Sequence, residues 1–321
     1  MHAVMVSAPG GPEVLDYSEQ PDPVAGPGEI LIRNEAIGLN FVDIYQRTGL
    51  YPGEFPRILG SEAAGTVEVV GPGVTRFKVG DRAAFVGGPA SYAELSAVKA
   101  DRAFHAAPGV SAKVAAASGL KGLTAEYLTR IWPVGPGDTV LLHAAAGGVG
   151  TLLSQWLAHL GVRVIGTVGS AAKAKLARAQ GCAEVILYDQ EDVATRVREL
   201  TGGAGVKVVY DSVGKSTFDA SLASLQRRGL MVTFGNASGP VPPVEPIRLS
   251  RAGSLFLTRP TLYDYIATTD ELDAAAARLS EVITSGVVTV KVDQEWPLSK
   301  VQDAHRAMAA RETTGASVMI P

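Results

Sequence analysis

The sequence contains very little cysteine, with Cys182 alone among 321 residues. One cysteine cannot form a disulfide within the chain, which is typical of proteins in a reducing cytoplasm. A zinc site needs three or four Cys, His or carboxylate ligands with suitable reach, and the five histidines are scattered without ligand spacing. We therefore expect no bound metal, and we expect Cys182 to be a small buried hydrophobic residue.

Strong net charge and long apolar runs are lacking as well. The formal net charge is −3 and the pI is about 6.0, so no overall field favours nucleic acid or an anionic membrane. No apolar run approaches the roughly 18 residues of a membrane-spanning helix. No basic and then apolar leader follows Met1. These absences predict a soluble cytoplasmic protein and speak against nucleic acid or a membrane as its partner.

Apolar residues, in contrast, are plentiful. Hydrophobic residues make up 46% of the chain and charged residues 19%, which is enough apolar material for two cores of roughly 150 residues each. The first third is β-rich, with short runs at 30–37, 63–70 and 82–86 that Gly and Pro residues separate. Helical patterns follow at 112–117 and 123–130.

From residue 139 onward, strands and helices alternate. We expect strands at 139–143, 163–168, 184–188, 206–211, 230–234 and 254–257. We expect helices after the glycine run at 143–150 and at 172–180, 193–200 and 217–226, with Gly161 and Gly181 at helix ends. Six strands with intervening helices predict an α/β, doubly wound parallel sheet. The C-terminal part predicts helices at 270–285 and 300–310 and strands at 287–292 and 317–320.

The glycine-rich run from His143 to Gly150 is the most informative motif. It follows a short apolar strand and opens an apolar helix. Such a turn directs free backbone N–H groups and the positive end of the helix dipole outward, which suits a pyrophosphate. A Cβ atom would block the close approach of a phosphate to the backbone. We therefore predict a dinucleotide site that includes Gly147, Gly148 and Val149.

The choice between the two nicotinamide cofactors depends on residues about 20 positions further on. An NAD site usually has Asp or Glu there to bind the ribose 2′-hydroxyl. This chain has Gly169, Ser170 and Lys173 instead, and no carboxylate. Gly169 and Ser170 leave room for a 2′-phosphate, Ser170 can donate a hydrogen bond, and Lys173 supplies charge. Lys173 on its own could equally be a solvated helix residue, but the missing acid predicts NADPH.

Further motifs occur in order along nearly the whole chain. They lie at 10–15, 38–43, 49–52, 60–65, 121–124, 143–150, 211–214, 226–232, 234–236 and 258–260. With these motifs the chain resembles the zinc-free quinone oxidoreductases, related to ζ-crystallin, of the medium-chain dehydrogenase/reductase superfamily. The resemblance implies a GroES-like, β-rich catalytic domain at 1–121 and 262–321. It also implies a Rossmann NADP-binding domain at 122–261, an active cleft between the two domains and a homodimer.

The resemblance also implies roles for individual residues. Asn40 and Tyr45 match positions that line the nicotinamide pocket, and Tyr51 matches a position that borders the acceptor. Read alone, these would be a turn residue, a half-buried helix aromatic and a loop-packing residue. Thr124 would approach the nicotinamide or cap a helix. The other cofactor-binding candidates are Tyr188, Val213, Phe234, Asn236, Thr258, Arg259 and Arg311, of which the two arginines could instead be surface charges.

The chain departs from the zinc enzymes of the superfamily at their metal ligands. Those enzymes use a Cys, the His of a Gly-His-Glu run and a second Cys, whereas this chain reads Gly60-Ser61-Glu62 and has Asp43 in the region of the first Cys. Without a Lewis acid, the favoured acceptors are small molecules that are already electrophilic, namely quinones or alkenes conjugated to a carbonyl. The sequence therefore predicts an NADPH-dependent quinone oxidoreductase.

Two alternatives remain open at this stage. An NADPH-dependent enal or enone reductase would need a proton donor near the acceptor, for which Tyr45 and Tyr51 are the local candidates. A protein of another class would bind NADPH without useful turnover, as crystallin-like or RNA-binding relatives do. The acidic balance and the lack of a Lys/Arg-rich stripe speak against RNA.

Overall fold

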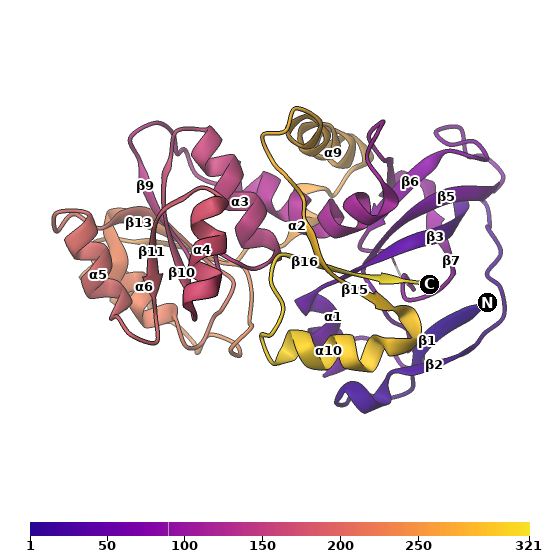
Figure 1. Cartoon of the computed structure of the whole chain (residues 1–321), viewed down its shortest axis with the longest axis horizontal. Coiled ribbons are helices and arrows are strands. Elements are labelled where there is room, and N and C mark those ends of the chain that lie inside the picture. The colour runs from indigo at the N-terminus through magenta and orange to yellow at the C-terminus, as the bar shows by residue number, and fades with distance from the viewer. Residues whose placement is uncertain (89) are drawn as a thin grey trace. The chain divides into compact units, whose positions relative to one another are not determined.

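The computed structural model describes residues 1–88 and 90–321. The chain forms two compact units (Figure 1). The first unit comprises Met1–Leu123 and Ile266–Pro321, and the second comprises Thr124–Tyr265. The chain therefore returns to the first unit after completing the second. Within the described part of the chain, no helix is both long and apolar enough to cross a membrane.

The first unit is built on two sheets. A small antiparallel sheet has the order β2-β1-β4, and a larger sheet has the order β15-β16-β3-β5-β6-β8, with β7 also paired to β3. The strands are β1 (His2–Val6), β2 (Asp16–Glu19), β3 (Glu29–Leu39), β4 (Arg57–Ile58), β5 (Glu62–Val70), β6 (Arg82–Val86), β7 (Leu95–Lys99), β8 (Ala103–His105), β15 (Val292–Pro297) and β16 (Ala316–Ile320). Because β16 pairs with β3, the C-terminal strand (yellow in Figure 1) completes a sheet begun near the N-terminus.

The helices of the first unit are few. They are η1 (Pro12–Val14), α1 (Phe41–Arg47), η2 (Ala100–Arg102), α9 (Thr269–Thr284), η3 (Leu298–Lys300) and α10 (Val301–Ala309), together with the first part of α2 (Ala112–Arg130). The core of this unit lies between the sheets and α10, where Ile32, Leu39, Phe85, Tyr92 and Met308 are buried. Alternation in the middle of β3 produces this packing, since Ile32 is buried and Arg33 is exposed.

Helix α2 includes both segments predicted to be helical, 112–117 and 123–130, and also the residues between them, which the prediction left out. The glycines in that intervening part allow close packing: a Cβ on Gly119 would lie 2.8 Å from Glu62 Oε2, and one on Gly122 would lie 2.6 Å from Leu279. These glycines are therefore contact points inside a helix.

The predicted strand at 287–292 is also wrong. The strand in this region, β15, begins at Val292, where pairing with Ala316 of β16 begins. Val288 is buried, and its N–H donates to the carbonyl of Val282 at 2.8 Å. A backbone N–H that closes the end of α9 cannot also join a sheet, so this apolar segment packs without becoming a strand.

The second unit contains the predicted six-stranded parallel sheet, which confirms the fold class. Its order is β11-β10-β9-β12-β13-β14, and every pair is parallel. The strands are β9 (Thr139–Leu142), β10 (Arg163–Val168), β11 (Cys182–Leu187), β12 (Val206–Asp211), β13 (Leu225–Thr233) and β14 (Phe256–Thr258). The strand order reverses between β9 and β12, which is where sheets of this type bind ligands.

Helices connect these strands. They are α3 (Gly148–His159), α4 (Ala171–Ala179), α5 (Val193–Leu200), α6 (Phe218–Ser224), α7 (Pro246–Arg251) and α8 (Leu262–Tyr265). Right-handed crossovers place α3 and α4 on one face of the sheet and α5 and α6 on the other. Gly161 and Gly181 follow the ends of α3 and α4 with φ of 75° and 100°, as expected for left-handed residues that end a helix. Cys182 is buried, and burial raises its thiol pKa to about 12, so it behaves as a packing residue.

Candidate functional site

The carboxyl ends of the parallel strands bring most of the predicted cofactor residues to one edge of the second unit. The glycine turn follows β9, and Gly169 follows β10. The others at this edge are Ser170 and Lys173 after β10, Tyr188 after β11, Val213 after β12, Phe234 and Asn236 after β13, and Thr258 and Arg259 at the end of β14. Residues scattered over more than 100 positions of sequence therefore share one edge because the strands are parallel.

Gly150 and Gly147 differ in whether the turn itself requires glycine at their position. A Cβ on Gly150 would lie 2.3 Å from the carbonyl oxygen of Ala144, which itself has φ of 52°. The turn therefore excludes any other residue at position 150. Gly147 has an extended backbone with φ of −84°, and a Cβ there would lie 3.1 Å from the same oxygen. Its backbone conformation does not require glycine.

Gly147 is also the N-cap of α3, and no side chain caps this helix. The first backbone N–H groups of a helix have no partner within the helix and carry partial positive charge. Gly147, Gly148 and Val149 are each half-buried. A bare helix N-terminus behind a glycine turn is a cradle that fits a pyrophosphate, and a side chain at position 147 would fill it.

The residues after β10 form the second part of this edge. The Ser170 hydroxyl accepts a hydrogen bond from the Lys173 backbone N–H at 3.3 Å and so caps α4. A hydroxyl that accepts one N–H keeps its own proton for donation, so the cap leaves Ser170 able to bind an anion. A Cβ on Gly169 would lie 2.5 Å from the Tyr188 hydroxyl. Because residue 169 has no side chain, the Tyr188 hydroxyl can pack against the loop that follows β10.

A buried histidine lies behind these loops. His143 directly follows β9; its Nδ1 lies 2.9 Å from Thr167 Oγ1 and its Nε2 lies 3.0 Å from Ser221 Oγ. Ser221 in turn donates its proton to Asp211 Oδ2 at 2.9 Å. Because that proton is given to a carboxylate, His143 must donate from Nε2 and accept from Thr167 at Nδ1. We call this series of hydrogen bonds the Thr167 chain.

The Thr167 chain ends on a carboxylate that also shapes a binding loop. Asp211 Oδ1 accepts the backbone N–H groups of Val213 and Gly214 at 2.7 and 3.0 Å. Its Oδ2 accepts the Thr217 hydroxyl at 2.7 Å as well as Ser221. The chain thus connects the end of β10, just before Gly169, to the loop that carries Val213. The sequence alone does not reveal this network, because its members lie far apart in the sequence.

In the first unit, the predicted catalytic residues lie on and after α1. Asn40 is the N-cap of α1 and is buried. Tyr45, on α1, is buried, and its ring packs edge-on against that of Tyr51 at a centroid distance of 5.2 Å. The Tyr51 backbone N–H also donates to the Tyr45 carbonyl at 3.0 Å. The structure therefore brings Tyr45 and Tyr51 together at one end of α1 and leaves Asn40 at the other.

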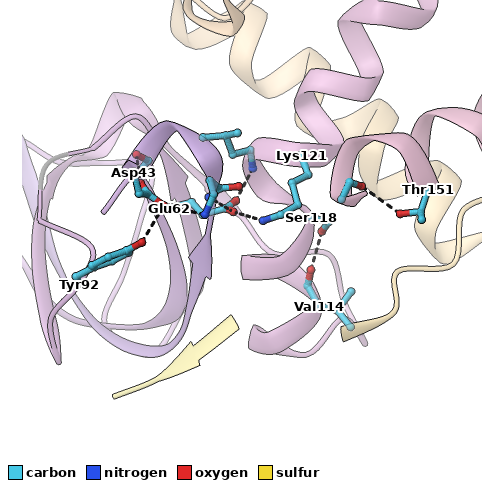
Figure 2. A network of polar contacts seen from close by, with 11 residues as sticks. Asp43, Glu62, Tyr92, Val114, Ser118, Lys121 and Thr151 are labelled. Atoms are coloured by element: carbon cyan, nitrogen blue, oxygen red, sulfur yellow. Dashed lines mark hydrogen bonds and ion pairs between the residues drawn. The ribbon is translucent and has the colours of Figure 1, made fainter. Parts of the chain in front are cut away.

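A buried ion pair fixes the Asn40 side chain. Glu62 at the start of β5 accepts from Asn40 Nδ2 at 2.8 Å and from Lys121 Nζ at 3.0 Å, and it also accepts the Leu120 N–H (Figure 2). Glu62 fits there because Gly38 has no side chain: a Cβ on Gly38 would lie 2.1 Å from Glu62 Oε1. Since a buried carboxylate needs this many donors, Glu62 and its partners determine where the Asn40 amide points.

Ser61, which replaces the His of the Gly-His-Glu run, is hydrogen-bonded to Asp43, which lies in the region of the first Cys of that pattern. Asp43 on α1 accepts the Ser61 hydroxyl at 2.7 Å, the Asn40 N–H at 2.8 Å and the Tyr92 hydroxyl at 2.9 Å. Burial raises the pKa of Asp43 to about 6, although these hydrogen bonds favour the charged form. Among the described residues there is no group of three or more His, Cys, Asp or Glu that could hold a metal ion.

The remaining candidates are less closely grouped. Thr124 is buried within α2, and Arg259 donates from Nη1 to the Thr233 carbonyl at 3.2 Å. Arg311 belongs to the first unit, where it follows α10 with φ of 60°. Arg311 therefore lies at the C-terminal end of α10, whereas Arg259 lies at the carboxyl edge of the parallel sheet. Glu62 and Lys121 were missed as site residues, and their sequence signal was weak, because each is a single charged residue within a short glycine-containing motif.

Comparisons with known proteins agree with this architecture. The alcohol dehydrogenase GroES-like domain matches residues 26–132, and the zinc-binding dehydrogenase family matches residues 148–281. A quinone oxidoreductase of Pseudomonas aeruginosa is 49% identical over 99% of each chain. A 2-haloacrylate reductase of a Burkholderia species is 41% identical over 99% of this chain and 98% of its own.

A solved structure is equally similar. The Escherichia coli quinone oxidoreductase, crystallised with NADPH, has a TM-score of 0.98 and 45% identity, with all of both chains covered. The match extends over both units and includes the glycine turn, the loop after β10 and the α1 region. The chain therefore belongs to the quinone oxidoreductase family of the medium-chain dehydrogenase/reductase superfamily.

Proposed function

We propose that the protein is an NADPH-dependent quinone oxidoreductase that works without a metal. The observation that carries the proposal is the carboxyl edge of the second unit, where a bare glycine cradle lies at one strand end and Ser170 with Lys173 at the next. The relatives named quinone oxidoreductase, and the one crystallised with NADPH, support it.

The chain's own residues would hold the cofactor in two places. The cradle at Gly147, Gly148 and Val149 binds the pyrophosphate through backbone N–H groups. Ser170 donates a hydrogen bond to the 2′-phosphate, and Lys173 neutralises part of its charge. A charge-assisted hydrogen bond contributes about 1.5–3 kcal/mol, which is enough for a preference of about tenfold or more over NADH. When bound, NADPH supplies a hydride.

The remaining predicted cofactor residues of the second unit would line the rest of the cofactor. These are Thr124, Gly169, Tyr188, Val213, Phe234, Asn236, Thr258 and Arg259. Tyr188 lies against Gly169, close to where the 2′-phosphate would be held. Val213 is held by Asp211, so its loop is fixed before the cofactor binds.

The first unit would contribute Asn40, Tyr45 and Tyr51 on the acceptor side. The Glu62 contact orients the Asn40 amide, and the Tyr45–Tyr51 packing orients the two phenols. With Ser61 and Asp43 hydrogen-bonded to each other, no Lewis acid activates the acceptor. Catalysis then consists mainly of alignment, which can remove much of the barrier for an acceptor that is already electrophilic.

The cofactor assignment is tested by Lys173→Ala, with dissociation constants for NADPH and NADH measured by cofactor fluorescence. Lys175→Ala is the matched control, because Lys175 lies on the same helix and is exposed. We expect tighter binding of NADPH than of NADH in the unmutated protein, and a gap that Lys173→Ala narrows and Lys175→Ala leaves unchanged. Equal dissociation constants in the unmutated protein would refute the assignment.

The reaction is tested by kcat/KM for a quinone and for an enone, with the unmutated protein and with Tyr45→Phe. A quinone needs no obligatory proton at the hydride step, so Tyr45→Phe should change its reduction little. An enone must be protonated on carbon after hydride addition, so its reduction should suffer more. A loss of about 10²-fold or more on the quinone would show that Tyr45 is a general acid there, and that alignment alone is the wrong account.

Reduction of a conjugated alkene is the second candidate function, and the similarity to a 2-haloacrylate reductase favours it. It would use the Tyr45 and Tyr51 pair as the source of the proton. Higher kcat/KM on enones than on quinones, together with a large loss in Tyr45→Phe, would identify this activity. A cofactor-binding protein without turnover would oxidise NADPH with neither acceptor.

Assembly as a homodimer and a cytoplasmic location belong to the same proposal. Strand β14 lies at the edge of the six-stranded sheet, and Phe256 on it is 49% exposed. An exposed strand edge with an aromatic side chain is suited to pairing with a second copy. Light scattering after size-exclusion chromatography would give twice the chain mass for a dimer, and the mass of one chain would contradict it.

A further inference from the structure

Helix α1 carries two buried residues of opposite charge one turn apart. Asp43 and Arg47 have exposed fractions of 0% and 4%. Residues four apart in a helix lie on the same face, and here they are connected through two side chains of other elements. These are Tyr92, which precedes β7, and His305 on α10.

The hydrogen bonds of this connection have one direction. Arg47 Nη1 lies 3.0 Å from His305 Nδ1, His305 Nε2 lies 3.0 Å from the Tyr92 hydroxyl, and that hydroxyl lies 2.9 Å from Asp43 Oδ2. A guanidinium can only donate, so Nδ1 of His305 must accept and Nε2 must carry the proton. Tyr92 therefore accepts from His305 and donates to Asp43. We call this series the Arg47 chain.

Both ends of the Arg47 chain are fixed further. Asp43 also accepts the Ser61 hydroxyl and the Asn40 N–H, and Arg47 Nε donates to the Gly10 carbonyl at 3.2 Å. The chain thus closes a ring that begins and ends on α1. Together these hydrogen bonds attach one face of the helix to four other segments of the first unit, at Gly10, Ser61, Tyr92 and His305.

Tyr45 lies midway between Asp43 and Arg47 in the sequence. At about 100° per residue, its side chain leaves α1 on the side opposite to theirs. The opposite face is where Tyr45 meets the ring of Tyr51. A seven-residue helix is too short to be stable by itself. Its orientation, and that of Tyr45, therefore depends on what holds its polar face.

We propose that Tyr92 and His305 are positioning residues that set the orientation of Tyr45 and Asn40 through α1. The inference rests on the proposed function, in which Tyr45 and Asn40 lie on the acceptor side. Tyr92 and His305 touch neither acceptor nor cofactor in this account. Their loss should impair the alignment of the acceptor and leave NADPH binding, which is assigned mainly to the second unit, nearly unchanged.

Tyr92→Phe tests the inference, because it removes one hydroxyl and keeps the ring. Tyr210→Phe is the matched control: the Tyr210 hydroxyl is also buried but has no hydrogen-bond partner among residues 1–88 and 90–321. We expect kcat/KM for a quinone to fall about tenfold or more in Tyr92→Phe, since small misplacements in a reacting complex have effects of this size. The NADPH dissociation constant should change less than twofold, and Tyr210→Phe should change neither.

A readout independent of turnover is the tautomer of His305, measured by NMR with ¹⁵N-labelled histidine. The Arg47 chain requires neutral His305 with its proton on Nε2 in the unmutated protein, and we expect the Nε2 signal to shift in Tyr92→Phe. A proton on Nδ1 would overturn the chain. Because this measurement needs no substrate, it stands even if the protein reduces neither quinones nor enones.

A second pair of variants covers the case in which Tyr92→Phe does not fold. His305→Gln keeps a hydrogen-bonding amide toward Tyr92, whereas His305→Leu keeps only similar bulk. Quinone kcat/KM should be several-fold higher in His305→Gln than in His305→Leu, at equal NADPH affinity. Equal kcat/KM in the two variants, or a parallel loss of NADPH binding, would show that His305 serves packing alone.

Discussion

Each unit of the molecule buries one histidine between a hydrogen-bond donor and a hydroxyl that leads to a carboxylate. The Arg47 chain of the first unit consists of Arg47, His305, Tyr92 and Asp43, and the Thr167 chain of the second consists of Thr167, His143, Ser221 and Asp211. In both chains the carboxylate also accepts backbone N–H groups near candidate site residues. The two units therefore stabilise their functional segments by the same device.

The difference is the group that donates to the histidine. Arg47 can only donate. Burial, together with the Arg47 charge, lowers the pKa of His305 to about 3. Thr167 can turn its hydroxyl and accept instead. Burial also lowers the pKa of His143, but the nearby Asp211 charge acts in the opposite direction. His305 is thus restricted to one neutral tautomer, whereas His143 could be protonated on Nδ1 if the Thr167 hydroxyl turned to accept that proton.

The largest expected effect comes from removing the two donors. Arg47→Met leaves the Asp43 end of its chain uncompensated, and removing one member of a buried charged set costs about 3–5 kcal/mol. Thr167→Val removes one neutral hydroxyl and should cost about 1–2 kcal/mol. Urea unfolding at pH 7 measures both. Equal losses in the free energy of unfolding would show that the charge of Arg47 stabilises its unit no more than the neutral Thr167 hydroxyl stabilises the other.

The pH dependence of stability separates the two histidines. A lowered pKa means that His305 contributes stability that is complete above about pH 6.5 and is lost as the pH falls toward 3, at up to about 1.4 kcal/mol per pH unit. Asp43, with its pKa raised to about 6, has the opposite sign: its contribution is complete below about pH 4 and is lost as the pH rises through 6.

In His305→Gln the Asp43 contribution remains, and it increases as the pH falls from 7 to 4. Over this range the urea midpoint of His305→Gln should therefore rise relative to that of the unmutated protein, which also loses the His305 contribution. His143→Gln should change the profile by a smaller amount, because Thr167 can turn to accept when His143 is protonated. Urea midpoints at four pH values decide between these outcomes, and a larger change in His143→Gln would reverse the comparison.

The smallest expected difference concerns the two serines. Ser221→Ala removes a donor to Asp211 and leaves the His143 Nε2–H without its acceptor, whereas Ser61→Ala removes only one of the donors to Asp43. An unsatisfied buried donor costs about 1–3 kcal/mol. Ser221→Ala should thus be less stable than Ser61→Ala by about 1 kcal/mol in urea unfolding. The reverse order would show that His143 does not depend on Ser221.

The two units also differ in how much of their structure could be predicted from the sequence. In the second unit, the parallel sheet and the glycine turn at its carboxyl edge could be predicted from local signals, namely glycines after an apolar strand and the alternation of strands with helices. The strand at 287–292 failed because Val288 gives its N–H to the end of α9. The middle of helix α2 was not predicted, because the sequence does not show that Gly119 packs against Glu62 inside a helix rather than lying in a turn.

The polar interior of the first unit was not predictable for a similar reason. Asp43 and Ser61 were recognised only as departures from a zinc site, and their hydrogen bond requires α1 and the start of β5 to be in place. His305 is more than 200 positions from Tyr92, at a spacing that no sequence motif describes. Such contacts are properties of tertiary packing, and only the folded chain shows them.

The central claim is that this protein passes hydride from NADPH to a quinone without a metal. The most direct test is NADPH oxidation by a quinone after exhaustive chelation, with the metal content of the same sample measured by elemental analysis. The account predicts full activity with no stoichiometric metal, because Ser61 stands in place of the His of the Gly-His-Glu run and is hydrogen-bonded to Asp43. Stoichiometric zinc that is lost together with the activity would contradict it.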